Sequence, residues 1–403
     1  MSKQKEQAVQ TPHCRSYHGF TFWLYRLAGT LYAKFYAGFR SKTVKHEIKQ
    51  PHLILSNSQT LRDPWLVRLA FDYPVYCVQT LAVRRDPIGM IGDWLTSPIR
   101  HKPSLLRQNT FPVQKIKQVL TEGGSVCLFP MGEPTFGFAP GTLSEHTVPL
   151  IRALQVPVIL YTVHGGAGAL PRWSEGRRKG PFIGRYEQTL LPEDYASMTD
   201  EQLYTLISRT LYVNDRAQNL TYKSNHRAEK LERVLYVCPR CRTHSSLYSS
   251  GTHISCRGCG MTANYTEAGK FVFLNCETPI STVDTWMDYQ LSWLKNRIEE
   301  MSGEIYTDQG VTIFSVDKIP ADEPLFGKLI MTREKLLLRF EDGEAGTRTV
   351  GFSLDSVVSL RCYDKVKLSL ITSQGTWEIT GAPDFCAYKY AQLFLALRGQ
   401  FKK

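Results

Sequence analysis

The 403-residue sequence predicts an α/β domain, then a small cysteine-rich module, then a β-rich domain that ends in one helix. Three observations predict this order. Short apolar runs alternate with helical patterns from residue 51 to about 220, as expected for an α/β domain with a largely parallel sheet. Four cysteines follow in two closely spaced pairs, and from about residue 303 short strands with alternating apolar residues take over.

Residues 1–45 form an N-terminal segment whose second half is the most aromatic stretch of the chain. Arg26, Lys34 and Arg40 interrupt its apolar residues, so no uncharged run reaches the roughly 18 residues of a membrane-spanning helix. Aromatic rings with spaced cations favour a helix lying in the lipid headgroup layer. The alternative is a helix packed on its own domain. The first fifteen residues are polar and do not look like a cleavable signal, so we expect reduced cysteines and a peripheral or monotopic protein on the cytoplasmic face of a membrane.

Residues 46–220 contain the predicted α/β domain. Its apolar runs are rich in β-branched residues and bounded by Pro, Gly or Asn, which is typical of buried strands. Strands are predicted at 52–56, 73–78, 125–129 and 156–163, and helices at 111–124 and 145–155. The polar stretch 214–234 is predicted to be a solvated helix or a linker.

Residues 234–275 contain the cysteine pattern C-x2-C-x14-C-x2-C. Two such pairs can bring four thiolates within tetrahedral reach of one Zn²⁺, and four protein ligands leave no open position for chemistry. The spacing therefore predicts a structural zinc ribbon. Its ligands would be Cys238, Cys241, Cys256 and Cys259. The ribbon carries few basic residues and no array of basic and aromatic residues, so nucleic acid is not an expected partner.

Residues 280–302 have the apolar spacing of a single connecting helix, and residues 303–403 follow as a β-rich domain. Strands are predicted at 311–316, 326–332, 335–340, 349–354, 356–364, 366–372 and 376–381. An amphipathic helix over 383–399 ends the domain. This order of about seven short strands and one helix resembles the β-barrel of pleckstrin-homology (PH) and GRAM-like domains.

Four short motifs occur in order along the α/β region: residues 56–64, 98–102, 128–132 and 156–159. The first reads SNSQTLRDP and follows a predicted strand. Together they resemble the motifs of the glycerolipid acyltransferases, the 1-acyl-sn-glycerol-3-phosphate acyltransferase family. Asn57, Asp63 and Pro64 match that family's N-H-x4-D-P, and Ser58 stands at the position of its histidine.

The resemblance implies an acyltransferase-like α/β fold and acyl transfer from acyl-CoA or acyl-carrier protein to lysophosphatidate or a similar lysolipid. It places the catalytic pair at Asp63 and Ser58, where the family's histidine would take the proton of the acceptor hydroxyl and the aspartate would orient the imidazole. The positions that it implies for substrate binding are Asn57, Arg100, Lys102, Phe129, Pro130 and Gly132.

Three positions depart from the family pattern. Ser58 replaces the histidine, Met131 replaces a glutamate, and Pro134 stands where a phosphate-binding arginine is expected. Serine is not a base near neutral pH, and losing a general base costs about 10²–10⁴ in rate. Two hypotheses follow: an acyltransferase of glycerophospholipids, or an inactive lipid-binding or regulatory pseudoenzyme at the membrane.

The net charge of the chain and a second run of basic residues indicate which kind of partner the protein binds. The chain has 49 Lys and Arg against 37 Asp and Glu, a net charge of +12, which favours an anionic partner such as a phospholipid or lysophospholipid surface. Arg172 and the run 177–179 are expected either to contact lipid phosphate or to form an ordinary solvated loop.

Overall fold

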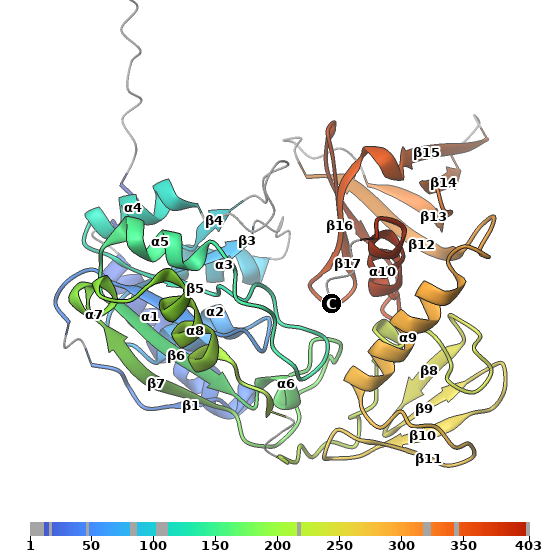
Figure 1. Ribbon diagram of the computed structural model, residues 1–403, viewed down its shortest axis with the longest axis horizontal. Helices are drawn as coiled ribbons and strands as arrows, with labels where there is room; N and C mark the ends of the chain where they lie inside the picture. The colour runs from blue at the N-terminus through green and yellow to red at the C-terminus, as the bar shows by residue number, and fades with distance from the viewer. Residues whose placement is uncertain are drawn as a thin grey trace, which may run out of the picture.

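The computed structural model describes residues 12–15, 18–45, 48–80, 87–101, 112–215, 219–316, 324–341 and 346–399. The described chain forms a seven-stranded mixed sheet, a four-stranded sheet and a second seven-stranded sheet. In Figure 1 the first sheet lies on the left and the other two on the right, with helix α9 (Val283–Arg297) running between those two.

The first sheet has the strand order β1-β7-β6-β2-β5-β3-β4. Its strands are β1 (Arg40–Ser41), β2 (Leu53–Ser56), β3 (Val75–Thr80), β4 (Ile99–His101), β5 (Ser125–Leu128), β6 (Val158–His164) and β7 (Ile183–Leu190). The five strands from β6 to β4 are parallel, which confirms the predicted sheet, and β7 is antiparallel to β6. The sequence did not predict β7, because most of its side chains are exposed or half-buried.

Helices cover both faces of this sheet, because successive strand residues point to opposite sides. Leu53 and Leu55 of β2 pack in one cluster, and Ile54 packs in the other. The first cluster is covered by α4 (Val113–Thr121), α5 (Thr147–Leu154), α7 (Pro192–Ala196) and α8 (Asp200–Leu211). The second is covered by α2 (Asp63–Leu69) and the π-helix η1 (Tyr32–Ala37). Helix α1 (His18–Leu31) precedes η1 and packs against α2 and α3 (Pro87–Thr96), and α6 (Gly166–Ala169) follows β6.

The four-stranded sheet is antiparallel, with the order β11-β10-β9-β8. Its strands are β8 (Leu247–Ser250), β9 (His253–Cys256), β10 (Thr262–Tyr265) and β11 (Phe271–Phe273). Helix α9 begins where the Thr282 hydroxyl accepts a hydrogen bond from the Thr285 N–H at 3.2 Å. It then buries Trp286, whose indole N–H donates to the Val237 carbonyl at 2.9 Å.

The described part of the segment 214–234 is not the predicted solvated helix. It contains one turn of 3-10 helix, η3 (Leu231–Arg233), and Ala228, Leu231 and Arg233 are buried. Arg233 is tolerated in this position because its guanidinium donates to the carbonyls of Trp173 and Pro383.

The C-terminal sheet is antiparallel, with the order β15-β14-β13-β12-β18-β17-β16. Its strands are β12 (Tyr306–Ser315), β13 (Leu325–Met331), β14 (Lys335–Glu341), β15 (Thr347–Ser353), β16 (Val357–Tyr363), β17 (Lys367–Thr372) and β18 (Gly375–Thr380), with the 3-10 turn η5 (Leu354–Ser356) between β15 and β16. The prediction of a closed barrel is wrong, because β15 and β16 end the sheet and do not pair in the described residues. Helix α10 (Ala387–Leu397) packs against β16 and β17, and its Tyr390 and Leu393 join the core, so a helix covers the apolar face that strand closure would have covered.

Candidate functional site

Asn57 lies at the carboxyl end of β2 and is fully buried. Its side-chain amide donates to the Val163 carbonyl at 2.9 Å, and its carbonyl oxygen accepts the Val163 N–H at 2.7 Å. Asn57 therefore extends the pairing between β2 and β6 by one side chain. These two hydrogen bonds position the turn that follows, which comprises residues 58–63 and is called the first-motif turn below.

Asp63 closes the first-motif turn from inside the protein. One carboxylate oxygen accepts the N–H groups of Gln59 at 2.5 Å and Thr60 at 2.9 Å, and the other accepts the Thr60 hydroxyl at 2.6 Å. The side chain is fully buried, and this burial outweighs the hydrogen bonds and raises the pKa of Asp63 to about 6. Ser58 is half-buried, and no hydrogen bond joins it to Asp63 or to a histidine among the described residues. The turn has no base–orienter pair at these positions.

The pKa of Asp63 predicts a pH-dependent stability. The folded protein holds this proton more tightly than a solvated aspartate with a pKa of 3.8 would, so the free energy of unfolding should decrease as pH rises from about 4 to about 6. A difference of about two pH units corresponds to roughly 3 kcal/mol. Urea unfolding of wild type and Asp63→Asn across this range should show a steeper decrease in wild type, because the amide oxygen still accepts the two N–H groups, while Asp215 and Glu133, whose pKa values burial also raises, contribute equally to both proteins. Exposed Glu145→Gln is the control; equal slopes for wild type and Asp63→Asn would contradict the assignment.

The second motif places Arg100 on β4. Its guanidinium forms an ion pair with the Asp93 carboxylate of α3, and the arginine side chain is 39% exposed. The structure thus gives this candidate phosphate contact a carboxylate partner. Lys102, the other basic candidate of the motif, lies outside the described residues.

The chain turns sharply within the third motif, residues 128–132, at the end of β5. Phe129 is half-buried and packs with the cluster on the α2 side, Pro130 is buried, and Met131 packs in the opposite cluster. Gly132 has a φ of +79° and donates its N–H to the Phe129 carbonyl at 3.0 Å, a left-handed conformation that favours glycine. Met131 is only 8% exposed, so the position where the family has its glutamate is part of the apolar core.

Arg172 joins the loop after the third motif to the C-terminal sheet. It is buried and forms an ion pair with Glu133 at 2.8 Å, and it donates to the carbonyls of Pro134, Cys362 and Asp364 at 2.7, 3.0 and 2.6 Å. Cys362 lies in β16, and Asp364 lies in the turn between β16 and β17. The expectation that Arg172 contacts lipid phosphate is therefore wrong, because its donors already bind groups of the protein.

The run 177–179 is also largely engaged within the protein. Arg178 is buried, with its guanidinium 5.3 Å from the ring of Trp173, and Arg177 donates to the carbonyls of Phe35 and Tyr36 at 3.0 and 3.1 Å. Lys179 is exposed. Residues 177–179 therefore do not form the expected solvated loop, because two of the three side chains contact other parts of the protein.

An exposed apolar surface covers α1, η1 and the neighbouring helix α3. We call it the apolar face. It consists of Phe20, Trp23, Leu27, Leu31, Phe35, Tyr36, Met90, Ile91 and Trp94. Each of these side chains is more than half exposed, up to 69% for Phe35, whereas Phe22 and Tyr25 of α1 are buried. The sequence predicted the α1 part, and the signal for α3 is the helical spacing of Met90, Ile91 and Trp94. In the part of the chain that the structure describes, no helix is both long and apolar enough to cross a bilayer.

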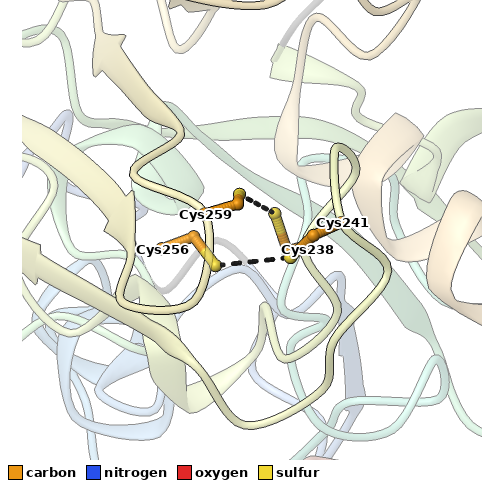
Figure 2. A group of neighbouring side chains, drawn as sticks. All are labelled: Cys238, Cys241, Cys256 and Cys259. Carbon is orange, nitrogen blue, oxygen red and sulfur yellow. Dashed lines mark hydrogen bonds between the residues drawn. The ribbon is translucent and has the colours of Figure 1, made fainter.

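The four predicted metal ligands come together at one end of the four-stranded sheet, as Figure 2 shows. Their sulfur atoms all lie within 4.8 Å of one another, and two pairs, Cys238 with Cys259 and Cys241 with Cys256, are 3.7 Å apart. Zn–S bonds of about 2.3 Å in a tetrahedron place sulfurs roughly 3.8 Å apart. The four cysteines therefore fit one tetrahedral metal ion.

Two matching turns hold these thiols. The N–H of Arg242 donates to the Cys238 carbonyl, and the N–H of Gly260 donates to the Cys256 carbonyl, each at 2.9 Å and each from a residue with positive φ. Burial opposes ionisation of Cys241, but hydrogen bonds led by those of the Thr243 hydroxyl and N–H prevail and lower the pKa of this thiol to about 6. Burial instead raises the pKa of the Cys238 thiol, so the four thiols titrate as one coupled group.

The sequence motifs did not identify Arg62 as a candidate functional residue, although it lies inside the first motif. Its guanidinium is 5.6 Å from the ring centroid of Tyr32 and 5.3 Å from that of Tyr36. The available signal was the pair of tyrosines four residues apart in the aromatic segment, a spacing that puts both rings on one helical face.

No family model matches the sequence, and no curated protein matches it either. Among solved structures, the chain is similar to the 1-acyl-sn-glycerophosphate (LPA) acyltransferase PlsC from Thermotoga maritima, with 13% identity, a TM-score of 0.40, and coverage of 50% of this chain and 79% of that one. It is also similar to the C-terminal domain of an unknown protein from Leishmania infantum (12% identity, TM-score 0.18, 27% and 98% covered) and to the DH/PH domains of p115-RhoGEF (17%, 0.19, 29% and 36%). The first of these similarities extends over half of this chain.

Proposed function

We propose that this protein binds phospholipid or lysophospholipid at a membrane surface through an acyltransferase-like domain that has lost catalytic turnover. The observation that carries the proposal is the apolar face, which lies directly beside the first-motif turn. A zinc ion held by the four cysteines would stabilise the fold and take no part in chemistry, because four protein ligands leave no open coordination position.

The apolar face has the composition of a surface that enters the lipid headgroup layer, and cationic side chains lie on the same helical segment. Burying a large apolar side chain contributes about 1.5–3 kcal/mol, and nine such side chains are exposed together. Tryptophan and tyrosine are common at membrane interfaces, and Trp23, Trp94 and Tyr36 supply them here. Arg26 and Lys34 lie on the same helical segment, in keeping with the net charge of +12 and an anionic membrane.

The first-motif turn supports binding better than catalysis. Acyl transfer to a hydroxyl requires a group that accepts its proton. Ser58 has no hydrogen-bonded base among the described residues, and both oxygens of Asp63 are bound by Gln59 and Thr60. Adding a histidine at position 58 would still leave it without an aspartate free to orient it.

Acyl transfer from acyl-CoA or acyl-carrier protein to a lysolipid such as lysophosphatidate is the second candidate function. What favours it is the placement of the motifs: Asn57, Asp63 and Gly132 all follow the carboxyl ends of neighbouring parallel strands, where α/β sheets commonly bind ligands.

Vesicle cosedimentation of the full chain tests the membrane proposal. The triple substitution Trp23→Ser, Leu27→Ser and Trp94→Ser should reduce binding to vesicles of phosphatidylcholine and phosphatidic acid by at least about tenfold, because it removes several kcal/mol of apolar transfer. The matched control is Tyr248→Ser with Val272→Ser, two exposed apolar residues of the four-stranded sheet, which should leave binding unchanged. If the triple substitution instead converts a dimer to a monomer in sedimentation and vesicle binding is unaffected, the face is a protein interface and the membrane proposal is wrong.

An acyl-transfer assay with radiolabelled acyl-CoA and lysophosphatidate separates the two candidate functions. We expect no transfer above background for wild type or for Ser58→His. Transfer by wild type that Ser58→Ala abolishes, with vesicle binding intact, would establish the enzyme and reject the pseudoenzyme.

A further inference from the structure

Two histidines, His13 and His18, lie where the start of α1 meets the end of α3. We propose that this pair is a pH-sensitive joint: protonation of the two imidazoles detaches α1 from Ser97, the residue that follows α3, and so separates the two helices that carry the apolar face. The inference goes beyond the proposed function, because it concerns how the apolar face is assembled, and its test needs no membrane.

Both histidines hold Ser97. Nε2 of His13 lies 3.0 Å from the Ser97 carbonyl oxygen, and Nε2 of His18 lies 3.0 Å from the Ser97 hydroxyl. Ser97 has a φ of +41°, a left-handed conformation that residues other than glycine rarely adopt. Such a conformation persists only where the surrounding structure holds it. The two histidine contacts therefore fix the chain at the point where it leaves α3.

The hydrogen bonds of His18 require its neutral form. Its Nδ1 accepts the N–H of Arg15 at 3.3 Å and lies 2.8 Å from the Tyr76 hydroxyl. A backbone N–H can only donate, so Nδ1 carries no hydrogen, and Nε2 is the nitrogen that donates to Ser97. Protonation places a hydrogen on Nδ1 that faces the hydrogen of the Arg15 N–H. It thereby opposes the turn that leads into α1, in which the His18 N–H donates to the Arg15 carbonyl at 2.9 Å.

The positive charges around the pair also oppose protonation. The imidazole rings of His13 and His18 have centroids 6.4 Å apart, so two imidazolium ions would repel each other. Arg15 faces both rings, Arg68 of α2 faces His18, and Lys115 of α4 faces His13. His18 also lies in the first turn of α1, where the helix dipole disfavours a cation.

The acidic groups nearby do not cancel this effect. Glu122, at the end of α4, is the carboxylate that favours protonation of both rings, but it is exposed and already accepts the N–H of Cys14 at 2.6 Å. The Asp93 carboxylate of α3 pairs with Arg100. Tyr76 of β3 stays neutral, because burial raises the pKa of its hydroxyl.

Burial is the largest influence on the pair, and together with the cations it lowers the pKa of His13 and His18 below the 6.5 of a solvated imidazole. The detached form then binds protons more readily than the docked form, so the docked form loses stability as pH falls below 6.5. This direction is opposite to that expected for Asp63, whose effect on unfolding decreases stability as pH rises. A measurement local to α1 therefore separates the two groups.

Hydrogen exchange of the full chain tests the joint. Protection factors are measured by mass spectrometry between about pH 7.5 and about pH 5, the range in which histidines titrate. We expect the protection of the α1 amides to fall by about tenfold or more with decreasing pH, the change that one unit of pKa shift produces. The protection of α8, a helix without histidine on the other face of the sheet, should not fall.

The double substitution His13→Gln and His18→Gln removes both titrating groups and keeps side-chain amides that can donate to Ser97. The α1 amides of this variant should keep their protection at acid pH. His253→Gln, at an exposed histidine of β9, is the matched control and should behave as wild type. An equal fall of α1 protection in wild type and in the double variant would overturn the proposal, as would a fall in α8 equal to that in α1.

Lys115→Glu tests the joint with both histidines in place, and it carries the comparison if the double variant does not fold. The new carboxylate faces His13 and should make the acid-induced loss of α1 protection smaller. Lys117→Glu reverses the same charge at another exposed position of α4 and should leave the loss unchanged. Equal responses of the two lysine variants would contradict the joint.

Discussion

Removing the metal from the four-cysteine site is expected to unfold the four-stranded sheet and to loosen α9. The strands β8 to β11 contain three or four residues each, and such short strands bury too little apolar surface to fold alone. Cys238 and Cys256 lie in the same buried cluster as Trp286 of α9, so losing the metal removes the anchor of that cluster. Structural zinc contributes about 10–16 kcal/mol in zinc-finger peptides, and even a fraction of this exceeds the stability of a small sheet.

The effect should extend into the C-terminal sheet, because α9 serves both cores. Trp286 packs with the four-stranded sheet, whereas Trp293 and Leu294 pack with the C-terminal sheet. Elemental analysis should find one zinc per chain, and chelation or Cys238→Ser should lower the urea midpoint and the near-ultraviolet circular dichroism. Cys276→Ser, at a half-buried cysteine outside the site, is the matched control. A metal-free protein with an unchanged unfolding midpoint would contradict the assignment.

Arg172→Met is expected to destabilise the contact between the α/β domain and the C-terminal sheet by about 1–3 kcal/mol, the cost of leaving buried hydrogen-bonding groups without their partner. The substitution leaves Glu133 without its partner and three carbonyls without their donor. It also removes the guanidinium that lies 4.3 Å from the ring centroid of Phe136.

Urea unfolding measures this loss, and Arg209→Met, at an exposed arginine of α8, is the control for removing a charge. Glu133→Gln should cost less in the Arg172→Met background than in wild type, since the two residues form one ion pair. A loss below about 1 kcal/mol for Arg172→Met, in the range of a surface pair, would show that the contact is not a stabilising one.

Sequence patterns alone predicted those features that depend on residues close together in the chain. The spacing of Cys238, Cys241, Cys256 and Cys259 predicts the metal site because each pair needs only one tight turn, and those two turns form as expected. The apolar runs of β2, β3, β5 and β6 predict buried strands because a strand covered on both faces must be apolar throughout. The aromatic segment before residue 40 predicts an apolar surface, and six of its large apolar side chains are exposed in the structure, whereas Phe22, Tyr25 and Phe39 are buried.

The tertiary structure decided which polar groups remain available for a ligand. Asp63 turns inward to the N–H groups of its own turn, and Arg172 binds carbonyls up to 192 residues away in the chain. The local pattern of apolar and polar residues does not reveal such partners, because a charged residue is buried only where distant backbone groups form hydrogen bonds with it. Long-range packing also explains the open C-terminal sheet, where α10 covers the apolar face and the strands do not close into a barrel. It likewise explains the position of Arg62, whose aromatic partners come from a different helix. The sequence by itself determined the metal ligands, the buried strands and the apolar N-terminal segment, whereas long-range packing alone decided which charges were satisfied within the protein.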